Sequence, residues 1–199
     1  HNPYKELIFS KLKKMTFPVV IKSLTGFSSY GMDVAKTFSE ALHFLTQKSG
    51  NEDKIIQEYK EGLHFGLEIY GTKDSFEIKP PFKFSLNKYG ITSPKQSTKI
   101  GPFNWEEPEY QEKIKLSTLK NDMKRLWKTL GFSGSIQVDL VFSEGKWYII
   151  EINPRLSGMT FTYAALENCS PQELLLKAVL PKAEKPNPAL EILCTSKIP

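Results

Sequence analysis

A carboxylate, an amide and an arginine alternate at the end of the apolar stretch "WYIIEINPR", residues 147–155. Glu151 and Asn153 are two residues apart, so a strand places their side chains on one face. Asp139 lies shortly before them, in the similar stretch "GSIQVDLVF". Carboxylate and amide oxygens suit a hard cation such as Mg²⁺, which keeps coordination places for water and phosphate. The pattern indicates a metal site for a phosphate ligand; a sheet edge with solvated acids is the alternative.

The turn "FSEGK" decides whether the two carboxylates share a face. A two-residue turn needs a positive φ at Glu144, which is costly for glutamate, so we expect a three-residue loop, residues 143–145, with Gly145 left-handed. In that register Asp139 lies diagonally across from Glu151 on the same face. Two such carboxylates repel each other unless a cation lies between them.

A second candidate for phosphate chemistry is the stretch "FPVVIKSLTGFSSYG", residues 17–31. In a strand, Val20 and Lys22 point the same way, so that a flat base could lie against Val20 and a phosphate against Lys22. The following loop, 25–31, offers hydroxyls and backbone N–H groups that could fold over phosphate oxygens. A plain Ser/Gly linker is the alternative.

The elements that must position these residues form a mixed pattern of helices and strands. Apolar spacing predicts strands at 17–22, 32–36, 54–60, 63–71, 74–80, 134–142 and 146–153. It predicts helices at 4–15 (Leu7, Ile8 and Leu12 on one face), 37–50 (capped by Thr37 or Ser39), 109–130 and 171–180. Residues 80–108 are expected to form a lid or binding loop. This order predicts an α+β fold of two lobes, which we divide at 1–71 and 72–199.

The amino-acid composition limits which kinds of partner and which compartment we expect for this protein. The 27 basic residues include only two arginines and give a net charge of +5, which fits either a solvated lysine-rich surface or a basic cleft for a phosphate ligand. Without arginine clusters or a recognition motif, we expect no nucleic-acid partner. We also expect no membrane association, because the apolar runs are short. The two cysteines suggest neither a disulfide framework nor a zinc site, which favours the cytoplasm.

Taken in order, these segments resemble the ATP-grasp superfamily. "PVVIKSLTGFSSYGM" is similar to D-alanine:D-alanine ligases, and "QEYKEGLHFGLEI" resembles the strand that joins the two lobes and carries the adenine. "VDLVFSEGKWYIIEINPR" resembles the metal hairpin of carbamoyl phosphate synthetases and biotin carboxylases. The resemblance implies an ATP-grasp fold with the nucleotide between two lobes.

The resemblance also implies roles for individual residues. The nucleotide-binding set would be Val20 and Ile150 around the adenine, Glu58, Tyr59 and Lys60 along its edge, Lys22 on the α or β phosphate, and Ser28, Ser29 and Gly31 in the lid. His64 would bind the ribose as in biotin carboxylases, although an ordinary core or surface histidine is the alternative. Asp139, Glu151 and Asn153 would hold one or two Mg²⁺ (or Mn²⁺). Arg155, with Lys22, would act in catalysis on the transferred phosphate.

Two positions depart from the family pattern, and the lysine expected on the γ phosphate is not assigned. Phe27 replaces a glycine of the lid, and Gln137 replaces an arginine of the D-alanine ligases, which argues against that substrate. The lysine expected on the γ phosphate is one of four, Lys79, Lys83, Lys95 and Lys99.

The expected function is that of the ATP-binding portion of a ligase. It would join a small-molecule carboxylate to an amine or a thiol through an acyl phosphate. Family members carry a preceding α/β domain that this sequence lacks, so we expect a missing N-terminal domain or partner subunit. The alternative is a nucleotide-binding module without catalysis of its own.

Overall fold

The computed structural model describes residues 3–25, 31–46, 53–87, 90, 92 and 98–180, with side chains from residue 6 onward. Its contacts divide the chain into two compact units. The first unit contains residues 1–64, 83–100 and 141–146, and the second contains 65–82, 101–140 and 147–199. The lobe boundary predicted after residue 71 differs from this division of contacts, and the boundary itself stays a prediction.

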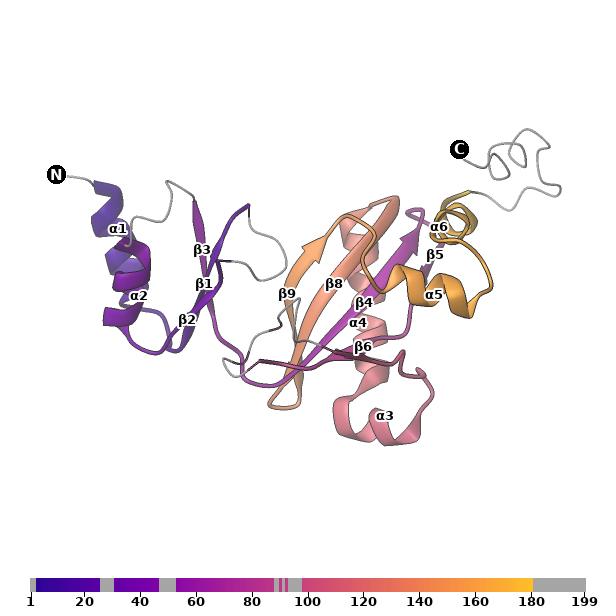
Figure 1. The fold of residues 1–199 in the computed structure, drawn as a ribbon, viewed down its shortest axis with the longest axis horizontal. Coiled ribbons are helices and arrows are strands. Elements are labelled where there is room, and N and C mark those ends of the chain that lie inside the picture. Colours follow the sequence, from indigo (N-terminus) through magenta and orange to yellow (C-terminus); the bar gives the residue numbers. More distant parts are fainter. Residues whose placement is uncertain are drawn as a thin grey trace. The chain divides into compact units, whose positions relative to one another are not determined.

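A three-stranded antiparallel sheet and two helices form most of the first unit (Figure 1). The elements are α1 (Pro3–Leu12), β1 (Val19–Ser23), β2 (Asp33–Ala35), α2 (Phe38–Thr46) and β3 (Lys54–Glu58), with strand order β2-β1-β3. Val19 and Ile21 are buried in a core with Leu12 and Ala41. Because side chains of a strand alternate, Val20 and Lys22 project from the other face of the sheet, away from this core.

The predictions for the two helices of this unit are partly right. Thr37 caps α2, because its hydroxyl accepts a hydrogen bond from the Glu40 N–H at 3.2 Å. On α1, however, Leu12 is 1% exposed whereas Leu7 and Ile8 are 50% and 46% exposed. Of the apolar face expected on this helix, only Leu12 is buried.

The larger sheet has the strand order β7-β6-β4-β8-β9, with β5 paired to β4. Its strands are β4 (Leu63–Gly71), β5 (Phe76–Ile78), β6 (Phe82–Phe84), β7 (Lys99–Ile100), β8 (Gly134–Ser143) and β9 (Lys146–Asn153). The helices that follow β7 are α3 (Pro108–Ile114), α4 (Leu116–Leu130), α5 (Thr160–Leu166) and α6 (Pro171–Val179). None of the helices in the described residues is long and apolar enough to span a bilayer.

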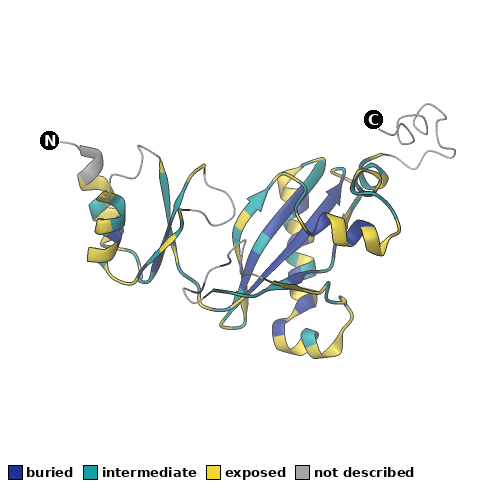
Figure 2. Ribbon diagram, viewed as in Figure 1, coloured by how far each residue is buried: buried dark blue, intermediate teal, exposed yellow. Residues whose placement is uncertain are grey.

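Helices lie on both faces of the sheet in the second unit. The indole of Trp127 on α4 donates to Thr72 O at 2.9 Å and packs on Phe76, so α4 covers one face. Strand β4, dark blue in Figure 2, is buried along almost its whole length. Glu68 of this strand bonds to Thr160 at the start of α5, so α5 lies on the face to which the even-numbered residues of β4 point.

Two sequence expectations about this part of the chain are wrong. The single helix predicted at 109–130 is two helices, because Lys115 adopts a left-handed φ of 54° between α3 and α4. Leu119, Met123 and Trp127 of α4 are buried, but Leu130 is 46% exposed. The segment 80–108 is not one loop, because it contains β6 and β7, which pair in antiparallel fashion.

Candidate functional site

The hairpin of β8 and β9 brings together two of the three predicted metal ligands through a third side chain. Gln137 Nε2 donates to Asp139 Oδ1 at 2.6 Å, and Asn153 Nδ2 donates to Gln137 Oε1 at 3.4 Å. Gln137 is only 7% exposed, so these contacts form at a sheltered position. Since the Asn153 nitrogen faces Gln137, its oxygen is the atom left for a cation. Glu151 lies on β9 two residues before Asn153, and its side chain is exposed.

The turn of this hairpin differs from the expected three-residue loop. It has two residues, Glu144 and Gly145, and both have positive φ, 49° and 75°. Two-residue turns of this kind match the right-handed twist of the strands, which offsets the cost at Glu144. Ser143 then stands opposite Lys146, so the predicted register is wrong, and in an unshifted ladder Asp139 would stand opposite Ile150 and not share a face with Glu151. The same ladder would put Asn153 and Gln137 on opposite faces. The side-chain hydrogen bond between them indicates that the end of β9 departs from that register.

Arg155 lies in the short segment that follows β9. Its N–H donates to Asn153 O at 2.8 Å, and its exposed guanidinium donates to Leu156 O at 3.2 Å. The backbone of this arginine is therefore tied to the predicted metal ligand Asn153.

Glu68 is an ionisable residue next to this segment that the sequence reasoning missed. It is 0% exposed, and its carboxylate accepts hydrogen bonds from the Ser157 N–H at 2.9 Å and from the Thr160 hydroxyl at 2.8 Å. The Tyr70 hydroxyl donates to it as well. Burial and the Glu68 carboxylate both raise the pKa of nearby Tyr163. The signal in the sequence was an acid in the middle of the apolar strand "HFGLEIYG".

In the first unit, the residues predicted along the adenine edge lie at the end of β3 and in the β3–β4 linker, residues 59–62. Glu58 and Lys60 form a half-exposed ion pair at 2.9 Å. The Tyr59 hydroxyl donates to Gly90 O at 3.3 Å, and burial, followed by the charge of Glu61, raises the pKa of this tyrosine. The linker is thus held by polar contacts on two sides.

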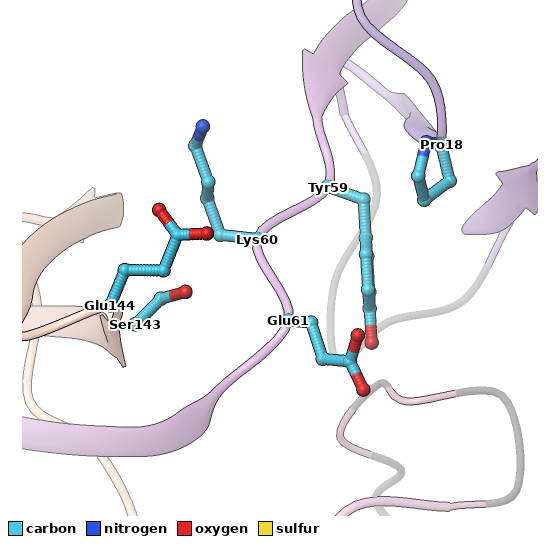
Figure 3. A pocket seen from close by; sticks show the side chains of 6 residues that line it. All are labelled: Pro18, Tyr59, Lys60, Glu61, Ser143 and Glu144. Atoms are coloured by element: carbon cyan, nitrogen blue, oxygen red, sulfur yellow. The ribbon is translucent and has the colours of Figure 1, made fainter.

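A polar cavity of about 410 Å³ borders this linker. Figure 3 shows its lining side chains, which are Pro18, Tyr59, Lys60, Glu61, Ser143 and Glu144. Gly62 passes so close to Phe142 O and Val141 that a Cβ at this position would collide with them. The linker and the tip of the β8–β9 hairpin therefore pack closely.

His64 begins the buried part of β4. It is 9% exposed, and burial lowers its pKa to about 4, so the imidazole is neutral at pH 7. Its Nε2 is the one buried side-chain polar atom without a hydrogen-bond partner in the described part of the chain. Buried polar groups without partners are costly and rare in native structures, so this atom is fitted to bind an external donor or acceptor.

The other predicted residues are less well defined by contacts. Ser28 and Ser29 lie outside the described residues, as do Phe27 and Lys95. Gly31 has a left-handed φ of 69° with open space around it. Val20 and Lys22 lie on β1, and Ile150 lies on β9.

Among the four lysines considered for the γ phosphate, Lys79 is held elsewhere. Its side chain is 3% exposed and its ammonium contacts Glu77 at 2.7 Å and also Glu167. Lys83 and Lys99 lie on β6 and β7. Lys79 therefore acts as a buried ion-pair residue, and it is an unsuitable phosphate ligand.

The family model described as "ATP-grasp domain" matches residues 1–159. The chain belongs to the ATP-grasp family. This confirms the resemblance inferred from the motifs at residues 18–32, 57–69 and 138–155, and with it the α+β ATP-grasp fold.

Proteins with a similar sequence include enzymes of different kinds. The carbamoyl phosphate synthase large chain of Clostridium perfringens (strain SM101 / Type A) is 26% identical over 149 residues, 73% of this chain and 13% of that protein. The D-alanine–D-alanine ligase of Thermotoga sp. (strain RQ2) is 28% identical over 162 residues, 77% of this chain and 50% of the ligase. This ATP-grasp chain thus spans about an eighth to a half of the length of these relatives.

Solved structures share the fold at lower identity. The biotin carboxylase domain of Hydrogenobacter thermophilus 2-oxoglutarate carboxylase, in complex with MgADP, ADP and bicarbonate, matches with a TM-score of 0.59 and 18% identity. That match covers 77% of this chain and 34% of the other. The VanG D-Ala:D-Ser ligase of Enterococcus faecalis matches equally well, with a TM-score of 0.59 and 20% identity, over 77% of this chain and 46% of the ligase.

Proposed function

We propose that this chain is the ATP-binding catalytic portion of an ATP-dependent ligase, which joins a carboxylate to an amine or a thiol through an acyl phosphate. The observation that carries the proposal is the arrangement of Asp139, Gln137 and Asn153 in the hairpin of an ATP-grasp chain. This arrangement offers oxygen ligands to a cation at the end of a strand.

The residues of the hairpin fit a magnesium ion. Asp139 and Glu151 would supply carboxylates, and Asn153 would supply the amide oxygen that its bond to Gln137 leaves available. In the described residues no three His, Cys, Asp or Glu side chains gather into a metal cluster. A site with two carboxylates and one amide agrees with this, because Mg²⁺ keeps several places for water and phosphate oxygens. Mg²⁺ or Mn²⁺ would supply neutralisation of charge on the phosphates.

The residues of the first unit supply the rest of the proposed nucleotide site. Lys22 would bind the α or β phosphate, with Ser28, Ser29 and Gly31 folded over the triphosphate. The backbone of Glu58, Tyr59 and Lys60 would meet the adenine edge, and Val20 and Ile150 its two faces. The buried Nε2 of neutral His64 fits a ribose hydroxyl, which would give this atom its missing hydrogen bond.

The proposed chemistry needs positioning and charge rather than a protein nucleophile. An oxygen of the substrate carboxylate attacks the γ phosphorus of ATP, the bond to the β,γ-bridging oxygen breaks, and ADP leaves with the electron pair. The amine or thiol then attacks the acyl carbon and inorganic phosphate departs. Arg155 would stabilise the phosphate in transfer, and Lys22 the charge that builds on ADP.

Glu151→Gln tests the proposal by isothermal titration with Mg·ATP. We expect the variant to bind Mg·ATP at least about tenfold more weakly than the parent chain, because a metal ligand is lost. Glu109→Gln is the matched control, since Glu109 is exposed on α3 and forms a surface ion pair with Lys113.

Two outcomes separate the possibilities. If nucleotide binds equally well in chelator, or if Glu151→Gln binds as the parent does, the proposed metal site is wrong. If binding is metal-dependent but no ATP is consumed with any carboxylate and amine, in this chain or in one extended upstream, the chain is a nucleotide-binding module without catalysis.

A further inference from the structure

We propose that Glu68 is a positioning residue that fixes Arg155 for contact with the transferred phosphate, acting through Ser157 and Thr160. This inference rests on the proposed function, because it concerns the arginine of the same site. Glu68 itself is fully buried and would touch neither nucleotide nor metal.

Linked hydrogen bonds join Glu68 to residues 157–160. One oxygen, Oε1, accepts from the Ser157 N–H at 2.9 Å and from the Thr160 hydroxyl at 2.8 Å. The Thr160 hydroxyl in turn accepts from the Ser157 N–H at 3.0 Å, and Ser157 Oγ accepts from the Met159 N–H at 3.0 Å. Residues 157–160 therefore form a compact turn fastened to the middle of β4.

This turn fixes one end of the segment that carries Arg155. The other end is Asn153, which belongs to β9 and bonds to Gln137. Only three residues, 154–156, lie between the two fixed points, and the Arg155 N–H bonds back to Asn153 O at 2.8 Å. With both ends held, the backbone of Arg155 has little freedom, whereas its exposed guanidinium can reach a ligand.

The cost of burying a carboxylate supports a role beyond packing. A buried ionised group is expensive even when it is paired, and apolar or neutral side chains often pack as well or better. Glu68 accepts hydrogen bonds from the hydroxyls of Tyr70 and Thr160 and from the Ser157 N–H. Both carboxyl oxygens of Glu68 accept hydrogen bonds from these donors, whereas an amide has only one acceptor oxygen, so the acid holds the segment at more points than glutamine would.

Glu68→Gln tests the proposal with two probes, Mg·ADP and the Mg²⁺ complex of the β,γ-imido analogue of ATP. The variant should bind the analogue about tenfold more weakly, since a small misplacement of a phosphate ligand is costly, and Mg·ADP within about threefold of the parent. Thr160→Val should behave in the same way because it loses the hydroxyl between Glu68 and Ser157. Thr160→Ser, which keeps the hydroxyl, should bind both probes as the parent does.

A double-mutant cycle separates positioning from general stability. If Glu68 acts through Arg155, then Glu68→Gln combined with Arg155→Ala should bind the analogue no more weakly than Arg155→Ala alone. Additive losses, or an equal loss of affinity for Mg·ADP, would overturn the inference. So would unfolding of both Glu68→Gln and Thr160→Val, since the contact would then serve the fold alone.

The same titrations distinguish failure of the inference from failure of the proposed function. If the parent chain binds neither probe, the proposed function fails and the inference falls with it. If the parent binds both probes and Arg155→Ala changes neither affinity, nucleotide binding stands and only the role of Arg155 and Glu68 is wrong.

Discussion

Gln137 is the residue through which two predicted metal ligands hold each other in place. It donates to Asp139 and accepts from Asn153 with the two ends of one amide. Residues that orient metal ligands typically affect metal affinity by about 10- to 100-fold. Gln137→Met, which keeps the side-chain length and removes both contacts, should therefore weaken Mg²⁺ binding in the presence of ATP by about that factor.

The measurement is a titration of the ATP-bound chain with Mg²⁺, followed by calorimetry or tryptophan fluorescence. Gln172→Met on the exposed side of α6 makes the same chemical change away from the hairpin. Equal Mg²⁺ affinity in the parent and Gln137→Met would contradict the role given to this amide.

His64 should make the stability of the chain depend on pH. Its pKa is about 4 in the folded protein, against the usual 6.5, because burial disfavours the charged imidazole. Unfolded chains therefore bind an additional proton between these two values, and the folded state loses stability as the pH falls through this window. The stability that comes from keeping His64 neutral is fully present above about pH 6.5. Because of this group, the free energy of unfolding should fall by about 2 kcal/mol between about pH 8 and pH 5.

Urea unfolding of the parent and of His64→Gln at both pH values tests this effect. Glutamine does not titrate, so the parent should lose about 2 kcal/mol more than the variant over this range. The comparison cancels the contributions of the carboxylates, which both proteins share. An identical loss in the two proteins would mean that His64 is protonated as easily in the folded chain as in the unfolded chain.

At the scale of single residues, the sequence offers candidates for chemistry, and the roles of these candidates stay predictions. Asp139, Asn153 and Arg155 could be selected because their types and spacing at a strand end suit a cation and a phosphate. Glu68 could not, because nothing local says which donors will surround an acid inside an apolar strand. Its partners, Ser157 and Thr160, lie about ninety residues later in the sequence.

The positions at which helices and strands end are likewise only partly predictable from the sequence. The strands β3, β4, β8 and β9 could be predicted from apolar runs, and Gly131 ends α4 as expected. The break at Lys115 could not be predicted, because lysine is a good helix former and neither glycine nor proline marks the position. Tertiary packing of two short helices, rather than local propensity, decides that conformation.

The hairpin turn leads to a prediction about stability at this scale. Glu144 has a φ of 49°, a conformation that asparagine adopts at lower cost and that Asn-Gly turns favour. Glu144→Asn should therefore raise the free energy of unfolding by about 0.5 to 1 kcal/mol. Thermal and urea unfolding measure this change.

A β-branched residue at the same position provides the opposite test. Glu144→Val should lower the free energy of unfolding, since a left-handed conformation is least favourable for such side chains. If Asn and Val at this position have equal effects, the turn does not contain the positive φ.

The whole molecule contains two units with separate cores, and the proposed nucleotide site takes residues from both. Leu12, Val19 and Ile21 belong to the core of the first unit, whereas Leu67, Met123 and Trp127 are buried in the second. We therefore expect either a separate unfolding transition for each unit or a single transition to which both units contribute. A ligand that binds both Lys22 in one unit and Asp139 in the other should stabilise both units, because both must be folded for the ligand to bind.

Mg·ATP should accordingly raise the unfolding temperature of the entire chain. At a concentration one hundred times the dissociation constant the gain is about 2.7 kcal/mol, which for a chain of this size corresponds to roughly 5 to 10 °C. Scanning calorimetry with Mg·ATP, and with ATP in chelator, measures it. Lys22→Ala and Glu151→Gln lie in different units, yet each should reduce the shift for all transitions. A shift confined to one transition would place the nucleotide within a single unit, and the proposed division of its ligands would be wrong.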